Sequence, residues 1–168
     1  MIKLLLIDVD GTLTDGKLAF VESSEGILES KSFHIHDGLG IVAWLKMGRE
    51  VAIISGRESK SVAKRASELG ITRVFMGVGD KSNIARNIIS GLGLTKEEVA
   101  CIGDDLNDLG MFRECGLRFA PSNANSYIKQ KADIILEKAG GEGAVRGMID
   151  FIVSRNEDES REFLSFYE

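Results

Sequence analysis

Several features that often explain a protein's function are scarce in this sequence. The chain has one proline and two cysteines, Cys101 and Cys115, which lie in apolar surroundings without metal-ligand spacing. Two buried thiols are therefore expected, and nothing indicates an oxidising compartment. No apolar run approaches the roughly 20 residues that a membrane helix needs. The first apolar run is interrupted by acids too soon to be a signal peptide, so we expect a cytoplasmic protein with no membrane partner.

An excess of positive charge is also lacking. The 21 lysines and arginines are outnumbered by 26 acids, which gives a formal net charge of -5 at pH 7. Such a chain has no broad basic face, so nucleic acid is not an expected partner. The 168 residues, 43% of them hydrophobic, are enough for one domain over 1–168 with a sizeable core.

Short apolar runs alternate with longer helical patterns along the chain. The apolar runs do not alternate with polar residues, which is typical of strands buried on both faces. Strands are predicted over 3–9, 51–54, 73–76 and 99–102, and weaker ones over 117–120 and 133–136. Helices are predicted over roughly 38–47, 59–69, 81–92, 105–114, 125–131 and 143–154. The alternation predicts an α/β fold, a Rossmann-like three-layer α/β/α arrangement with a mostly parallel central sheet.

One segment breaks this alternation. A polar, glycine-bearing stretch over 22–26 separates two apolar arms, which predicts a projecting β-hairpin over about 17–33. An isolated hairpin is marginal in water, so we expect it to pack on the body or on another subunit. Its apolar Leu18, Phe20 and Ile27 have little nearby to cover them, which is typical of a partner surface. The charged end, about 155–168, is expected to be a loose or partner-bound tail.

Residues that can carry chemistry stand at the ends of the predicted strands. Asp8 and Asp10 follow the first strand, Ser55 follows the second and Asp104 follows the fourth. Lys81 opens a helix after a glycine-bearing turn. In an open parallel sheet, ligands bind outside the carboxyl ends of the strands. We therefore expect these side chains to meet at one edge of the sheet.

Two acids such as Asp8 and Asp104 repel each other when they share a small space. At a separation of 4 Å the repulsion is about 4 kcal/mol at a dielectric constant of 20, and a divalent cation relieves it. Carboxylate and carbonyl oxygens with several retained waters suit Mg²⁺. Ser55, Lys81 and free backbone amides are phosphate ligands, so the set indicates phosphoryl transfer. Taken singly, each residue has a simpler interpretation: a capping aspartate, a turn serine or a solvated lysine.

Four motifs occur together in a fixed order. They are Asp8-Val9-Asp10-Gly11-Thr12-Leu13-Thr14, Ser55 after an apolar strand, Lys81, and Gly103-Asp104-Asp105-Leu106-Asn107-Asp108. The set resembles the four motifs of the haloacid dehalogenase superfamily phosphatases, and the resemblance covers about 1–152. A lone Asp-x-Asp-Gly would be weak evidence, whereas the full set is specific.

The resemblance implies a role for each motif residue. Asp8 would be the nucleophile that forms an aspartyl-phosphate. Asp10 would protonate the leaving alkoxide and later deprotonate the attacking water. Mg²⁺ would be held by the Asp8 carboxylate, the Asp10 backbone carbonyl and Asp104. Ser55 would bind a phosphoryl oxygen, and Lys81 would neutralise phosphate and nucleophile together.

Asp105 and Asp108 are expected to support the site from behind or to lie at a helix end.

Many relatives carry a cap domain, but 15–51 holds only the hairpin and one helix, and 57–81 holds one helix and one strand. With no cap domain, the resemblance narrows to the small capless branch. Its members include the 3-deoxy-D-manno-octulosonate 8-phosphate phosphatases and relatives that act on nine-carbon keto-sugar acid phosphates. Membership implies a small phosphorylated sugar-acid substrate and a homotetramer in which neighbouring subunits cover the site.

Further segments resemble this branch and supply candidate substrate-binding residues. They are 33–38 after the hairpin, 55–57, and 140–146 near the end. Besides Asp10, Ser55 and Lys81, the resemblance implies substrate contacts for His34, His36, Asp37, Gly38, Gly56, Arg57 and Arg65. An arginine fork suits a carboxylate, although Arg65 could instead be a solvated helix residue. Arg146 belongs either to a tail that visits an adjacent subunit or to the start of a helix.

Three positions depart from the octulosonate pattern. His34-Ile35-His36 stands where those enzymes usually carry Asn-x-Arg, and Val42 stands where they tend to have arginine. The two histidines are expected on one strand face, where they could bind a sugar acid, hold a metal or remain solvated. Arg57 favours an eight-carbon substrate over the nine-carbon relatives.

Three functions are consistent with these patterns. The first is a Mg²⁺-dependent phosphatase for 3-deoxy-D-manno-octulosonate 8-phosphate. The second keeps the catalysis and takes a nine-carbon keto-sugar acid 9-phosphate or another sugar phosphate. The third is a non-catalytic module that assembles through the hairpin and tail, which the complete motif set disfavours.

Overall fold

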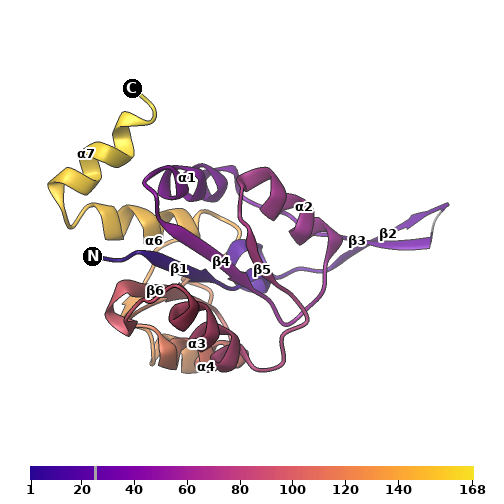
Figure 1. Cartoon of the computed structure of the whole chain (residues 1–168). Coiled ribbons are helices and arrows are strands. Elements are labelled where there is room, and N and C mark those ends of the chain that lie inside the picture. The colour runs from indigo at the N-terminus through magenta and orange to yellow at the C-terminus, as the bar shows by residue number, and fades with distance from the viewer. Residues whose placement is uncertain (25) are drawn as a thin grey trace.

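The computed structural model describes residues 1–24 and 26–168, and its centre is a six-stranded sheet (Figure 1). The strand order is β5-β4-β1-β6-β7-β8, and every neighbouring pair is parallel. The strands are β1 (Leu4–Ile7), β4 (Glu50–Ile54), β5 (Arg73–Phe75), β6 (Val99–Ile102), β7 (Leu117–Ala120) and β8 (Ile134–Ile135). The predicted α/β sheet is confirmed, with β8 only two residues long.

Helices cover both faces of the sheet. They are α1 (Ile35–Lys46), α2 (Lys60–Leu69), α3 (Lys81–Gly91), α4 (Leu109–Glu114), α5 (Ser126–Lys129), α6 (Ala144–Val153) and α7 (Glu157–Ser165). Short 3-10 turns, η2 (Lys96–Glu98) and η3 (Leu106–Asp108), precede β6 and α4, so the helix expected over 105–114 is divided. In the described part of the chain, every helix falls short of the length and apolar content needed to cross a bilayer.

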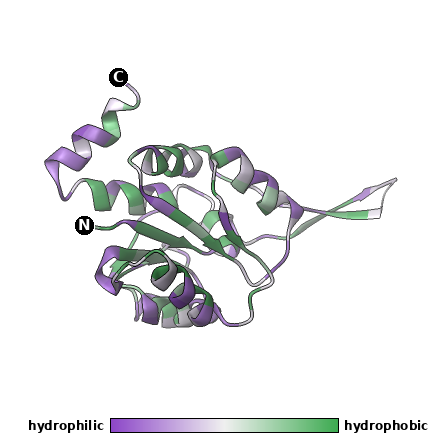
Figure 2. Cartoon of the chain, in the orientation of Figure 1, coloured by the Kyte–Doolittle hydropathy of each residue, from purple (hydrophilic) through white to green (hydrophobic). Residues whose placement is uncertain are grey.

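Successive residues of β1 face two separate cores. Leu5 and Ile7 pack with α1, α2 and α6, whereas Leu4 and Leu6 pack with α3, α4 and α5. Figure 1 shows α1 and α6 on one side of the sheet and α3 and α4 on the other, and Figure 2 shows the apolar strands between them. This double burial explains why the strand is apolar at every position, since each fully buried side chain contributes roughly 1.5–3 kcal/mol.

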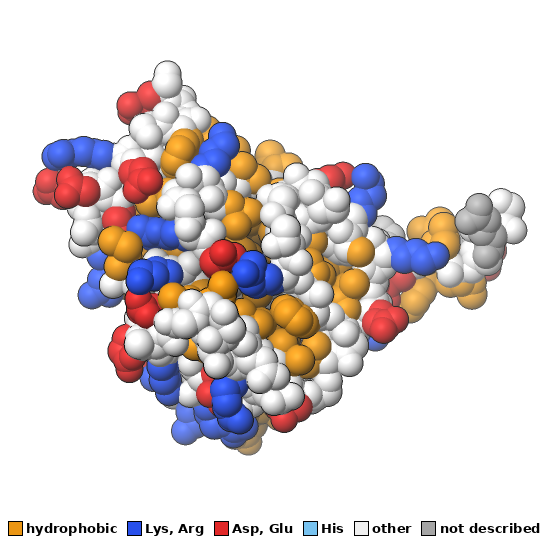
Figure 3. Space-filling view, viewed as in Figure 1, with side chains coloured by type: hydrophobic (Ala, Val, Ile, Leu, Met, Phe, Trp, Pro, Cys, Tyr) orange, Lys and Arg blue, Asp and Glu red, His pale blue; other side chains and the backbone are white. Residues whose placement is uncertain are grey.

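The predicted hairpin is present and projects away from the sheet (Figure 1). Strands β2 (Ala19–Ser23) and β3 (Gly26–Ser30) pair antiparallel, and an antiparallel bridge between Thr14 and Phe33 ties its base to the body. Exposed apolar side chains lie along it (Figure 3), namely Leu18, Phe20, Val21, Ile27 and Leu28. The hairpin therefore presents an uncovered apolar surface.

The structure differs from the sequence expectation near the first and last predicted helices. His36 lies in α1 and not on a strand, because His34 caps that helix by accepting a hydrogen bond from the His36 backbone N–H at 3.2 Å. The expected loose tail is the helix α7. The side chain of Asn156 caps it by accepting hydrogen bonds from the backbone N–H groups of Asp158 and Glu159.

The contacts that dock helix α7 on the body include an apolar anchor and an ion pair. Phe163 is buried at 3% exposure. Arg49 and Glu159 form a 2.8 Å ion pair with side chains 7% and 10% exposed. The Arg49 guanidinium lies 4.4 Å from the ring centroid of Trp44, an arrangement that favours the cation.

Replacing Phe163 by Ala should lower the free energy of unfolding by about 3 kcal/mol, because it removes a buried aromatic ring and leaves a cavity. Urea denaturation followed by circular dichroism measures the loss. The matched control is Leu164→Ala, since Leu164 is 54% exposed on the same helix and its loss should cost under about 0.5 kcal/mol. Equal effects of the two substitutions would show that α7 does not dock as described.

Candidate active site

The carboxyl ends of β1, β4 and β6 bring the predicted site residues to one edge of the sheet. β1 lies between β4 and β6, and the chain passes first to one side of it and later to the other. This reversal of strand order is where ligands bind in open α/β sheets. Asp8 directly follows β1, Ser55 directly follows β4, and Asp104 follows β6 after one glycine.

Three carboxylates form a cluster at this edge. One oxygen from each of Asp8, Asp104 and Asp108 lies within 4.8 Å of the others. Burial raises the pKa of Asp8 well above its usual range, and the negative charge of Asp108 adds to the effect. Burial and Asp108 together also raise the pKa of Asp104 to about 6. The cluster therefore needs added positive charge before all three groups can be ionised.

Lys81 supplies one positive charge to the cluster. Its ammonium contacts the Asp8 carboxylate and donates to Asp108 Oδ1 at 2.6 Å, and its side chain is 1% exposed. Burial alone would lower the pKa of Lys81, but Asp8 and Asp108 outweigh burial, so the pKa is raised. Lys81 remains a cation and faces the predicted nucleophile.

The donor set fits a hard divalent cation. Both oxygens of Asp108 are already engaged, since Oδ1 accepts from Lys81 and Oδ2 accepts from the backbone N–H groups of Asp104 and Asp105. The carboxylates left for a metal are those of Asp8 and Asp104, which belong to the predicted ligand set with the Asp10 backbone carbonyl. Oxygen ligands of this kind suit Mg²⁺. Asp105 lies at the start of η3, where its side chain accepts from the Leu106 N–H at 2.8 Å.

The loop over 9–13 is held tightly against Asp104. Gly11 has a φ of 94°, and a β-carbon there would overlap the Asp104 carboxylate. Thr12 donates its hydroxyl proton to Asp104 Oδ1 at 3.4 Å, and Thr14 donates to the Val9 carbonyl at 3.1 Å. The position of this loop against Asp104 thus depends on the absence of a side chain at Gly11 and on the hydrogen bonds of Thr12 and Thr14.

A glycine pair from the far end of the chain braces the same loop. The Gly141 N–H donates to the Thr12 carbonyl at 3.1 Å, and the Gly140 N–H donates to Asn123 Oδ1 at 2.9 Å. A β-carbon on Gly140 would overlap the carbonyl oxygen of Gly11. The glycine-rich segment over 140–143 therefore supports the Asp10 loop directly, a contact that sequence reasoning missed.

Ser55 is buried at 1% exposure, and backbone hydrogen bonds fix it between the neighbouring loops. Its N–H donates to the Phe75 carbonyl at 2.9 Å, and its carbonyl accepts from the Val78 N–H at 3.0 Å. Its hydroxyl oxygen accepts from the Arg57 N–H at 3.2 Å. A β-carbon on Gly56 would lie 3.7 Å from the Asn107 amide nitrogen, so the loops after β4 and β6 adjoin.

Comparison with known proteins identifies relatives along nearly the whole chain. A model for haloacid dehalogenase-like hydrolases matches residues 73–148. The 3-deoxy-D-manno-octulosonate 8-phosphate phosphatase KdsC of Haemophilus influenzae is 41% identical over 152 residues, which cover 90% of this chain and 83% of that protein. KdsC of Escherichia coli K12 is 38% identical, with 90% of this chain and 79% of that protein covered.

Solved structures agree with these relatives. A 3-deoxy-D-manno-octulosonate 8-phosphate phosphatase from Moraxella catarrhalis, in complex with magnesium, phosphate and KDO, has a TM-score of 0.89 and 38% identity over 98% of this chain and 93% of that chain. The chain belongs to the 3-deoxy-D-manno-octulosonate 8-phosphate phosphatase family of haloacid dehalogenase-like hydrolases. A cobalt-bound deoxy-D-mannose-octulosonate 8-phosphate phosphatase from H. influenzae has a TM-score of 0.86 and 39% identity over 97% of this chain and 96% of that chain.

The structure places the substrate residues suggested by the resemblance to this family in different surroundings. Asp37, Gly38 and Arg65 form one group: an ideal β-carbon on Gly38 would collide with the Arg65 guanidinium, so Arg65 lies against α1. Arg65 is also 3.6 Å from Glu68 on its own helix. Asp37 is 1% exposed, and its Oδ1 accepts from the Arg146 N–H at 2.7 Å, which supports the first turn of α6.

Burial raises the pKa of Asp37, and its Oδ2 has no hydrogen-bond partner among the described residues. The rings of His34 and His36 lie edge to face with centroids 4.8 Å apart. Among the described residues, neither histidine belongs to a cluster that could hold a metal. Arg146 lies in the first turn of α6, in agreement with the helix-start interpretation.

The hairpin adds charged residues that sequence reasoning missed. Lys31 contacts the Asp10 carboxylate, and Glu29 pairs with Arg57 at 2.6 Å. Charged residues in a projecting hairpin are expected to be exposed to solvent, so no sequence signal predicted these contacts. The structure thus places Asp10 and Arg57 beside the base of the hairpin.

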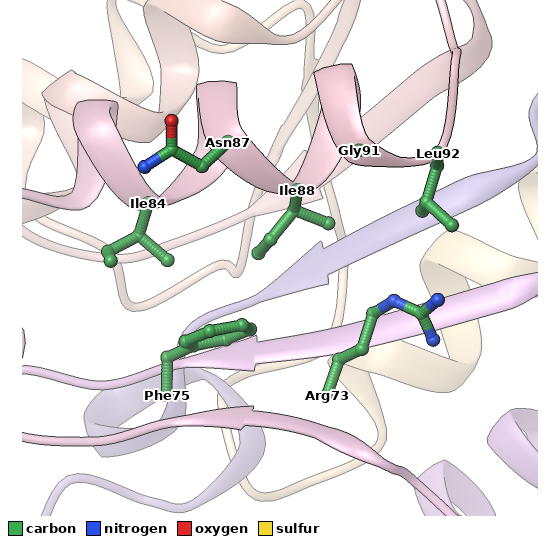
Figure 4. Close-up of a pocket in the computed structure, with 7 residues that line it drawn as sticks. All are labelled: Arg73, Phe75, Ile84, Asn87, Ile88, Gly91 and Leu92. Carbon is green, nitrogen blue, oxygen red and sulfur yellow. The ribbon is translucent and has the colours of Figure 1, made fainter.

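A separate hollow of about 340 Å³ lies between β5 and α3 (Figure 4). None of the predicted site residues lines it. Its walls are Arg73, Phe75, Ile84, Asn87, Ile88, Gly91 and Leu92. It is mostly apolar and takes no part in the acidic site.

Replacing Gly140 by Ala should lower both stability and activity, because the new methyl group has to displace the Gly11 carbonyl and with it the Asp10 loop. We expect about 2 kcal/mol of destabilisation and a weaker Mg²⁺ affinity by isothermal titration calorimetry. Gly91→Ala is the matched control, because open space surrounds Gly91 and alanine favours a helix by roughly 0.5–1 kcal/mol. Unchanged Mg²⁺ affinity in Gly140→Ala would exclude the brace.

Proposed function

We propose that this protein is a Mg²⁺-dependent phosphomonoester hydrolase that releases phosphate from 3-deoxy-D-manno-octulosonate 8-phosphate through an aspartyl-phosphate. The observation that carries the proposal is the buried Asp8, in contact with Lys81 and beside Asp104 and Asp108. A nucleophile, a fixed cation and an oxygen-ligand set in one place are the parts that phosphoryl transfer needs. The relatives that bear the same activity in their names cover most of the chain.

The reaction follows from the placement of these groups. Asp8 attacks phosphorus, the bond from phosphorus to the sugar oxygen breaks, and Asp10 gives its proton to the leaving alkoxide. Asp10, now a carboxylate, takes a proton from water as the water attacks the phosphorus of the aspartyl-phosphate. The bond from phosphorus to the Asp8 oxygen breaks, which restores the Asp8 carboxylate and releases phosphate. Lys81 and Ser55 hold the phosphoryl oxygens throughout. When bound, Mg²⁺ would be held by Asp8, Asp104 and the Asp10 carbonyl, and would supply charge neutralisation at the phosphoryl group.

Recognition of the sugar acid is assigned to the residues that surround this centre. The related enzyme from Moraxella catarrhalis binds a KDO molecule together with magnesium and phosphate. In this chain, Arg57 and Arg65 are the cations proposed for the carboxylate, and the segment over 34–38 is proposed to line the sugar. Arg57 is 48% exposed, so it remains accessible to a ligand while it pairs with Glu29.

A homotetramer is proposed for the assembly, with neighbouring subunits covering each site. The support is the hairpin, whose Phe20 and Ile27 are 64% and 72% exposed. Exposed apolar groups of this kind are typical of an interface. The cytoplasmic location expected from the sequence stays a prediction.

Replacing Asp8 by Asn should abolish phosphate release, by at least about 10³-fold in kcat, because the amide cannot act as nucleophile. The assay measures phosphate from a panel of eight-carbon, nine-carbon and simple sugar phosphates, with Mg²⁺ and again with a chelator. With Mg²⁺ and without chelator, the wild type and the control Asp158→Asn should be active, whereas Asp8→Asn and the chelator-treated samples should be inactive. Asp158 is a suitable control because its side chain is 94% exposed. A higher kcat/KM for a nine-carbon ester would identify that ester as the preferred substrate. If the wild type turned over none of the esters, the non-catalytic assembly role would be favoured instead.

Replacing Phe20 and Ile27 together by Ser should break the tetramer into smaller species, because the interface loses its apolar contacts. Size-exclusion chromatography with light scattering at micromolar concentration measures the mass. Ile135→Ser is the control, since Ile135 is 53% exposed on the body of the protein. A monomeric wild type would contradict the proposed assembly.

A further inference from the structure

Lys31 is a buried lysine that no predicted role explains. It directly follows Ser30, the last residue of β3, and its side chain is 1% exposed. The neighbouring Ser30 and Ser32 face solvent, so the alternation of the strand turns Lys31 toward the body. An ammonium group taken out of water costs several kcal/mol unless it is paired. Its partners therefore indicate why it is there.

The partners of Lys31 are two carboxylates. Its Nζ contacts Asp10 Oδ1 and lies 3.4 Å from Glu29 Oε1. Glu29 Oε1 is buried and has no hydrogen-bond partner among the described residues, so the ion pair with Lys31 is what compensates it. Glu29 Oε2 in turn pairs with the Arg57 guanidinium at 2.6 Å.

These contacts make an ordered chain of alternating charge: Asp10, Lys31, Glu29, Arg57. One end is the group proposed to protonate the leaving alkoxide, and the other end is a cation proposed for the sugar acid. Lys31 and Glu29 both come from the base of the hairpin. Removing Lys31 would leave two carboxylates facing each other with no cation between them, which is destabilising to the arrangement.

The position of the Asp10 carboxylate decides whether it can act. A general acid has to lie within about 3 Å of the oxygen that it protonates. The Asp10 side chain is 25% exposed, and the contact with Lys31 is what restrains it. A carboxylate without that restraint would rotate into solvent, and misplacement by about 1 Å can cost 10²-fold in rate.

We propose that Lys31 is a positioning residue for Asp10, and that Glu29 links it to Arg57, so that one hairpin strand aligns leaving-group protonation with substrate recognition. The proposal rests on the proposed function, because the role of Asp10 is part of that function. It gives the hairpin base a part in its own subunit's active site, separate from any assembly through the hairpin tip.

The test replaces Lys31 by Met and compares two esters in the full-length protein with Mg²⁺. A sugar phosphate leaves as an alkoxide and needs the proton from Asp10, whereas p-nitrophenyl phosphate has a leaving group that departs without it. We expect kcat for 3-deoxy-D-manno-octulosonate 8-phosphate to fall about 10²-fold and kcat for p-nitrophenyl phosphate to fall less than about 5-fold. KM for p-nitrophenyl phosphate should stay within about 2-fold if positioning is lost and phosphate binding is kept.

Three further variants separate positioning from a general structural effect. Lys31→Met in an Asp10→Asn background should add almost no further loss, because Lys31 acts through Asp10. Lys31→Arg keeps the cation and should recover at least about 10-fold of the loss for the sugar phosphate. Lys64→Met, at a lysine 77% exposed on α2, is the matched control and should leave both rates unchanged.

Glu29→Gln tests the other end of the chain and does not depend on the folding of Lys31→Met. It should raise KM for the sugar-acid ester several-fold and leave KM for p-nitrophenyl phosphate unchanged, because only the former carries the carboxylate that Arg57 is proposed to bind.

Equal losses for the two esters, or an additive loss in the Asp10→Asn background, would overturn the proposal in favour of a structural role. Wild-type rates in Lys31→Met would overturn it as well. If Lys31→Met does not fold, the ester dependence of Lys31→Arg and Glu29→Gln decides the question. A wild type that hydrolyses neither ester would refute the proposed function itself, whereas an active wild type with an unresponsive Lys31→Met refutes only this inference.

Discussion

The structure depends on the mutual repulsion of carboxylates that the fold forces together. Asp8 and Asp108 are buried beside Asp104, and the positive charge described in contact with Asp8 and Asp108 is the ammonium of Lys81. That single charge leaves the pKa values of Asp8 and Asp104 raised. A site built in this way favours a divalent cation, which relieves the repulsion among the carboxylates. Burying carboxylates with incomplete charge compensation lowers the stability of the fold. Groups with shifted pKa values of this kind are concentrated at functional sites.

Loops from distant parts of the chain maintain this arrangement. Gly11 brings the loop onto Asp104, and Gly140 in turn brings a glycine-rich segment onto Gly11. At both places the backbone approaches so closely that a β-carbon has no room. Residues separated by more than a hundred positions in the chain therefore depend on one another sterically, and the acidic site is as much a product of backbone packing as of charged side chains.

Much of this architecture could be predicted from sequence, for physical reasons that also set the limit. The strands were predictable because burial on both faces removes polar residues, as in β1, and the acids were predictable because parallel strands end at the same edge. The start of α1 was missed because histidine is an uncommon cap, yet His34 accepts the His36 N–H. Helix α7 was missed because its sequence is charged, although Asn156 followed by acids is a capping signal. Lys31 was beyond reach, since its burial depends on how the hairpin leaves the body.

The lengths of the strands have a consequence for association. The outermost strands of the central sheet, β5 and β8, are three and two residues long, too short to template pairing with another chain. The hairpin strands are five residues each and carry the uncovered apolar side chains. Unintended edge-to-edge aggregation is thereby discouraged at the central sheet, and the longer exposed strands described here lie apart from it, in the projecting hairpin.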